Sequence, residues 1–107
     1  MRKDKIQIKV KLDTVIDNFA SIVNKFKSDV AGFLGEEYRN KTQYVRIRSL
    51  KTGSLIINSQ LLMPEGLDFD TTLVSVKEQI LAANQLGGIP VLAVDKVGTW
   101  DPSTSEL

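Results

Sequence analysis

The 107 residues of this sequence include no cysteine and no histidine, which excludes several kinds of catalytic and metal-binding site. A tetrahedral zinc site of the usual ligand types needs one of those residues, and a Ser-His-Asp arrangement needs an imidazole base. A thiolate nucleophile and a disulfide are excluded for the same reason. Zinc, triad, thiolate and disulfide chemistry are therefore excluded, and the sequence implies no cofactor.

One serine follows a glycine at a predicted turn, in the segment Lys51-Thr52-Gly53-Ser54. Alternating apolar residues before and after it, over 44–50 and 55–63, predict two strands joined in a hairpin. Glycine suits such a turn because it adopts φ values that are costly for other residues. The hairpin therefore places a hydroxyl directly after the turn glycine.

Three acidic residues, Glu65, Asp68 and Asp70, lie in one predicted connection, where a hard cation would find oxygen ligands. Their spacing is not that of a calcium-binding loop, and we interpret Asp70 as the cap of the helix that follows. No acid–base constellation is recognisable elsewhere. We therefore predict no metal site and no enzyme that acts on other molecules.

Basic residues gather around the second predicted strand: Arg39, Lys41, Arg46, Arg48 and Lys51. Arg46 and Arg48 share the face opposite the core. Arg46, Arg48 and Lys51 are candidate ligands for an acidic glycan or another polyanion. The alternative interpretation is a solvated sheet face that is balanced by the nearby Glu36 and Glu37.

The whole chain gives no electrostatic case for a nucleic-acid or membrane partner, since 14 Lys and Arg stand against 13 Asp and Glu, a net charge of +1. Sheet domains that recognise single-stranded RNA stack bases on aromatic residues of their central strands. The third predicted strand carries Asn58 and Gln60 but no aromatic residue. We therefore expect no nucleic-acid partner.

Asn40-Lys41-Thr42 forms an N-glycosylation sequon in a polar connection. A surface loop is where a glycan acceptor must lie, so Asn40 is a candidate glycosylation site. Such short sequons also occur by chance, and a polar loop explains the same residues. The sequon agrees with an extracellular location without establishing it.

The periodicity of apolar residues predicts the elements that must position these groups. A period of two indicates strands, and steps of three and four indicate helices. We predict strands and helices over 5–12, 15–34, 44–50, 55–63, 70–86 and 89–97, the second helix ending at Gly87-Gly88.

This β-α-β-β-α-β order predicts an α+β fold, because right-handed crossovers place both helices on one face of a four-stranded antiparallel sheet. The expected architecture is a ferredoxin-like sandwich in a single domain, residues 5–98. Residues 1–4 are expected to be a start segment or linker, and residues 99–107 a tail. Such a fold is compatible with many functions and selects none of them.

The segment from Leu50 to Ile57, together with this element order, resembles the cleavage motif of SEA domains. These are extracellular modules of membrane-tethered mucins, proteoglycans, adhesion receptors and membrane-anchored serine proteases. The family pattern is Gly-Ser followed by branched aliphatic residues, between the second and third strands. The resemblance covers roughly residues 5 to 98, nearly the whole chain.

The resemblance implies a single-turnover autoproteolysis in which the Ser54 hydroxyl attacks the Gly53 carbonyl. An N-to-O acyl shift gives an ester that water hydrolyses, and the fragments stay associated because the two strands pair across the break. Strain in the peptide bond can replace a base, since a twist of about 12° in ω costs around 1 kcal/mol and the energy rises roughly quadratically. The missing histidine is no obstacle to this mechanism.

Two interpretations of the motif remain open, a self-cleaving bond and an uncut hairpin. Leu55 departs from the family, in which a stiffer β-branched residue more often follows the serine. The resemblance further implies a cell-surface glycoprotein with a membrane-anchored parent chain, whose partners are its own cleaved fragment, glycans or neighbouring ectodomains. The alternative function is a non-catalytic ferredoxin-like binding or assembly domain of a cytosolic or phage protein.

Overall fold

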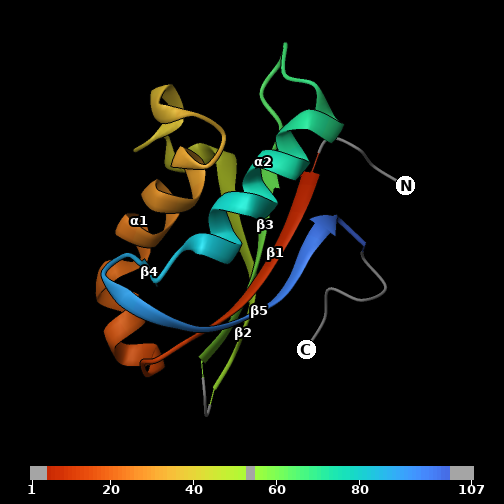
Figure 1. Ribbon diagram of the computed structural model, residues 1–107. Helices are drawn as coiled ribbons and strands as arrows, with labels where there is room; N and C mark the ends of the chain where they lie inside the picture. The colour runs from red at the N-terminus through yellow and green to blue at the C-terminus, as the bar shows by residue number, and fades with distance from the viewer. Residues whose placement is uncertain (1–4, 53–54, 102–107) are drawn as a thin grey trace.

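The computed structural model describes residues 5–52 and 55–101, which form an α+β fold with two α-helices and a five-stranded antiparallel sheet (Figure 1). The strand order in the sheet is β2-β3-β1-β5-β4. In chain order the elements are β1 (Lys5–Leu12), α1 (Ile16–Gly32), the 3-10 helices η1 (Glu36–Tyr38) and η2 (Thr42–Tyr44), β2 (Val45–Lys51), β3 (Leu55–Leu62), α2 (Phe69–Ala82), β4 (Gln85–Leu86) and β5 (Ile89–Thr99). The predicted α+β class is confirmed.

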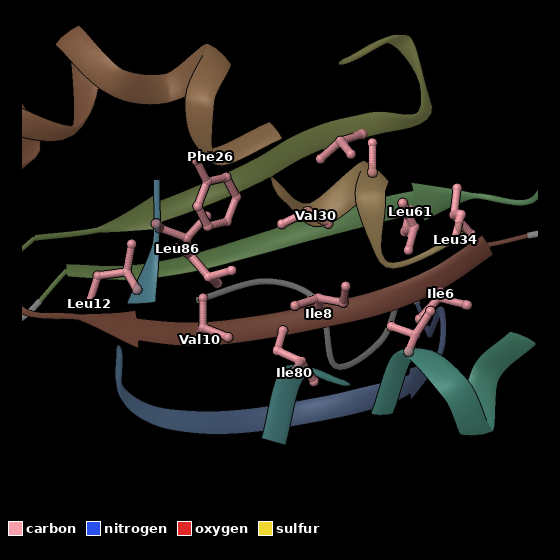
Figure 2. Close-up of a cluster of buried hydrophobic side chains, with 14 of the residues drawn as sticks. Ile6, Ile8, Val10, Leu12, Phe26, Val30, Leu34, Leu61, Ile80 and Leu86 are labelled. Carbon is pink, nitrogen blue, oxygen red and sulfur yellow. The ribbon is translucent and has the colours of Figure 1, made fainter. Parts of the chain in front are cut away.

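The core lies between the sheet and the two helices, on one face of β1 (Figure 2). Side chains alternate across a strand, so every second residue of β1 points into this core. The four residues are fully buried: Ile6, Ile8, Val10 and Leu12. From α1, the rings of Phe19 and Phe26 meet edge to face with centroids 5.2 Å apart. From α2, Val76 and Ile80 close the other side of the core.

Three β-bulges curl the sheet, because an extra residue on one strand bends it and increases its twist. Two lie where β5 pairs with β1, at Leu92 and Asp95, and the strongly curved β5 is visible in Figure 1. The third is Arg48 of β2, since Ile47 pairs with Ser59 and Ser49 with Asn58. A single sequence does not reveal these bulges because each is defined against its partner strand.

The prediction of four strands was wrong by one, and Gly87-Gly88 explains the difference. We expected these glycines to end the second helix, but α2 already ends at Ala82. Gln85–Leu86 form the two-residue strand β4, which pairs with the start of β5. Gly87 and Gly88 make the connecting turn with φ values of 60° and 85°, the left-handed region that favours glycine.

The start of α2 and the end of β5 also differ from the sequence predictions. Asp68, and not Asp70, caps α2, because its Oδ2 accepts hydrogen bonds from Thr71 N at 2.9 Å and Thr71 Oγ1 at 2.8 Å. The last strand runs two residues beyond the predicted Val97, and Trp100 N still donates to Lys5 O at 3.1 Å. The sheet therefore reaches past residue 98, where the tail was expected to begin.

Candidate functional site

The predicted cleavage motif falls in the sequence between β2 and β3, which pair as antiparallel strands. Gly53 and Ser54 themselves fall outside the described residues. The last residue pair between β2 and β3 is Lys51 with Ile56. Residues 52 to 55 therefore connect the two paired positions. The described flanks of the motif are two antiparallel strands, as the predicted hairpin requires.

The strands on either side of the motif differ in how many neighbouring strands they pair with. β3 pairs with β2 on one side and with β1 on the other, and its first residue, Leu55, is fully buried opposite Leu12. β2 is an edge strand, and its Leu50 is 36% exposed. An open, mostly apolar groove of about 350 Å³ is lined by residues of α1 and β2. The residues after Ser54 are therefore fixed in the middle of the sheet, and those before Gly53 lie at its edge.

The bulge at Arg48 adds twist to β2 shortly before the motif. Its guanidinium Cζ lies 5.8 Å from the centre of the Trp100 ring, so the side chain reaches across the face of the sheet that carries no helix. Arg46 and Lys51 are exposed on the same face. The three cations predicted to bind a polyanion thus share one face of the sheet.

Arg39 of the predicted basic cluster belongs to a separate network. Its Nε and Nη2 bind both carboxylate oxygens of Glu36, at 3.2 and 3.3 Å, and its Nη1 lies 3.4 Å from Asp29 Oδ1. The hydrogen bond to Glu36 raises the pKa of Arg39. Asp29 Oδ2 also accepts a hydrogen bond from Gly87 N at 2.6 Å. Glu36 therefore pairs with Arg39, and the predicted balance between Glu36 and the cations of β2 is not among these contacts.

The sequon residue Asn40 is exposed between η1 and η2, with a left-handed φ of 74° that asparagine tolerates better than most residues. The rings of Tyr38 and Tyr44 meet edge to face on either side of it, with centroids 5.4 Å apart. Desolvation and then the charge of Glu37 raise the pKa of Tyr38. The side chain of Asn40 is thus accessible in an ordered loop, as a glycan acceptor requires.

Sequence reasoning missed a buried polar cluster on the helix-free face of the sheet. Gln7 and Asn58 are fully buried there, Gln60 is 4% exposed, and Gln7 Nε2 donates to Asn58 Oδ1 at 3.0 Å. Within the described part of the chain, two buried side-chain atoms lack a hydrogen-bond partner, Gln7 Oε1 and Ser49 Oγ. The available signal was the pair of amides at Asn58 and Gln60, spaced by two on a strand otherwise rich in aliphatic residues.

The acidic connection before α2 does not form an ion site in the structure. Asp68 is occupied as the helix cap, and residues 5–52 and 55–101 contain no group of three or more acidic side chains that would hold a metal. Over the same ranges no helix has the length and hydropathy to span a membrane.

Three comparisons with known proteins, against family models, curated proteins and solved structures, found no match for this chain.

Proposed function

We propose that this chain is an SEA module of a cell-surface or matrix protein and that its Gly53-Ser54 bond cleaves itself after folding. The observation that carries the proposal is the order of the strands. β1 and β2 precede the bond in the chain, whereas β3 and β5 follow it, and in the sheet they alternate as β2-β3-β1-β5. A cut at this bond divides the chain but leaves the sheet intact.

The proposed reaction uses only the two residues at the bond. Ser54 Oγ attacks the carbonyl carbon of Gly53, the C–N bond breaks, and the hydroxyl proton passes to the released amine. Water then hydrolyses the ester to leave the Gly53 carboxylate and the free Ser54 hydroxyl. The energy comes from folding, since pairing and burial on both sides of a short connection can hold a distorted peptide in place. The fixed Leu55 and the bulge at Arg48 are the described features that support such strain.

Three strand interfaces would hold the fragments 1–53 and 54–107 together. β1 pairs with β3 over eight residue pairs, β1 with β5 over seven and β2 with β3 over six. Each interface joins one strand from either fragment, so separation requires unfolding of the whole sheet. In a membrane-anchored parent chain, such a joint would release the outer part only under force or denaturation.

The ferredoxin-like architecture is part of the same proposal. Without the two-residue β4, the order β2-β3-β1-β5 with all pairs antiparallel is the arrangement expected for β-α-β-β-α-β connectivity. Packing of both helices on the β1 face that carries Ile6 and Ile8 supports it. β4 is then an addition at the edge beside β5.

The test is the intact mass of freshly purified protein under denaturing conditions, for the wild type and for Ser54→Ala. We expect the wild type to give two masses that meet between Gly53 and Ser54 and sum to the chain plus one water, and Ser54→Ala to give one mass. Ser21→Ala, at an exposed serine of α1, is the matched control and should cleave as the wild type does. Fragments from Ser54→Ala, or an uncut wild type, would refute self-cleavage.

A non-catalytic binding domain is the second candidate, and the buried polar cluster on the helix-free face favours it. The two functions are separable by secretion from a eukaryotic cell. A glycan at Asn40 together with cleavage supports the SEA module. An unmodified and uncut chain that binds a ligand supports the second candidate.

A further inference from the structure

The helix-free face of the sheet is far more basic than the chain as a whole. The strands contain seven cationic residues, three on β1, three on β2 and one on β5, against the single acidic residue Asp95. Alternation directs those of β1 to the helix-free face, since the residues between them form the core. Half of the 14 basic residues are therefore on the strands of a protein whose net charge is +1.

The cations surround the buried polar cluster. Lys9 pairs with Asn58 on one side and with Lys96 on the other, and Arg46 pairs with Gln60. Ser49 pairs with Asn58 and so brings its partnerless Oγ to the same row. Because β3 and β1 are interior strands, Gln7, Asn58 and Gln60 lie in the middle of the positive face, and Ser49 lies beside them on the edge strand β2.

Buried polar atoms without partners are rare in native proteins and destabilise the fold, so those that persist call for an explanation. Gln7 Oε1 can only accept a hydrogen bond, and Ser49 Oγ can donate or accept. Both atoms are buried, so a ligand reaches them only when the side chains that cover them move aside. To satisfy Gln7 Oε1 the ligand must carry hydrogen-bond donors, which sulfate and the internal units of polyphosphate lack. The surrounding cations call for negative charge on the same ligand.

We propose that this face binds a linear anionic glycan, with sulfate or carboxylate groups on Lys9, Arg46 and Arg48 and sugar hydroxyls on Gln7 and Ser49. The inference does not depend on cleavage at Gly53-Ser54. Single-stranded nucleic acid fits less well, because binding of bases needs exposed aromatic platforms and Trp100, 6% exposed, already lies against Arg48.

Trp100 is the only tryptophan of the chain, so its fluorescence reports the Arg48 contact directly. We would titrate the protein with a heparin oligosaccharide, with inorganic polyphosphate as a polyanion without hydroxyls, and with neutral dextran. We expect heparin to bind and change the emission, dextran to have no effect, and rising salt to weaken binding. Heparin should bind more tightly than polyphosphate of equal charge.

Variants separate the two parts of the proposal. Arg46→Glu should weaken heparin binding by about tenfold or more, because it removes one favourable charge and adds a repulsive one. Lys25→Glu, an equal charge reversal at an exposed residue of α1, should leave binding within about twofold. Ser49→Ala should weaken heparin binding several-fold and leave polyphosphate binding unchanged. Thermal melting checks that each variant is folded.

Three results would overturn the proposal. Equal losses from Arg46→Glu and Lys25→Glu would mean attraction to net charge without a site. Equal affinity for heparin and polyphosphate, unchanged by Ser49→Ala, would mean that only charge is recognised. Absence of heparin binding at low salt would exclude the anionic glycan altogether.

Discussion

The two faces of the sheet use the same strands in opposite ways. On the helix-covered face, Ile8 and Ile57 are fully buried among other apolar side chains. On the helix-free face, Gln7 and Asn58 are equally buried but polar, and polar atoms there lack partners. Burial of apolar surface stabilises a fold, whereas burial of an unpaired polar group destabilises it. The apolar burial on the first face therefore offsets the destabilising burial of polar groups on the second.

This difference distinguishes the face that stabilises the fold from the face that could bind a ligand. A sheet that needed only to fold would be expected to carry satisfied or solvated side chains on its outer face. The helix-free face instead keeps an amide oxygen, Gln7 Oε1, without a partner among strands that carry cations, an arrangement that a ligand could complete. The contrast can be measured, because substitutions on the two faces should change stability in different directions.

The largest expected effect is in the helix-covered core. Phe26→Ala removes a fully buried ring that packs edge to face on Phe19 and should destabilise the protein by about 3–5 kcal/mol. Leu81→Ala, at a residue of α2 that is 61% exposed, should change stability by less than about 0.5 kcal/mol. Urea unfolding followed by circular dichroism measures both. A similar loss for both variants would contradict the assigned core.

A smaller effect is expected at the rim of the helix-covered side. Asp29 joins α1 to the β4–β5 turn through Gly87 N and also meets Arg39, so Asp29→Ala should cost about 1–3 kcal/mol. Asp29→Asn keeps an acceptor for Gly87 N but loses the charge, and it should lose less stability than Asp29→Ala. The midpoint of thermal unfolding compares the two. Equal losses would mean that the contact with Gly87 contributes nothing.

The smallest effect gives the most direct comparison of the faces. Ser59 Oγ is satisfied, donating to Ile8 O at 3.1 Å, so Ser59→Ala should lose about 1 kcal/mol. Ser49→Ala removes a buried hydroxyl that has no partner and should leave stability unchanged or raise it by up to about 1 kcal/mol. Chemical unfolding of both variants in parallel provides the measurement. A loss at Ser49 equal to that at Ser59 would show that the two serines are equivalent.

The elements that follow from local sequence were predictable, and those that depend on a partner strand were not. The strict alternation of Lys5–Leu12 gives β1 directly, and the stripe through Phe19 and Phe26 gives α1. The bulge at Arg48 and the burial of Gln7 appear only when β1, β2 and β3 are side by side. Likewise, Asp68 and Asp70 are both plausible caps in sequence, and the geometry of the first turn of α2 selects Asp68.

The candidate site divides in the same way. The Gly-Ser motif and the sequon are visible in the sequence, and the structure places their flanks in a hairpin end and an exposed loop. The collection of cations from three strands onto one face is not visible, because it requires the strand order. The same strand order yields the prediction that a cut chain remains one molecule.

The most direct test of the central claim is to compare the mass of the purified chain under native and denaturing conditions. Self-cleavage within an interleaved sheet predicts one species with the mass of the whole chain plus one water in native mass spectrometry. It predicts two species, residues 1–53 and 54–107, once the sheet is unfolded in denaturant. A single unbroken chain under both conditions would contradict self-cleavage, and two fragments that separate under native conditions would contradict the interleaved strands that we propose hold them together.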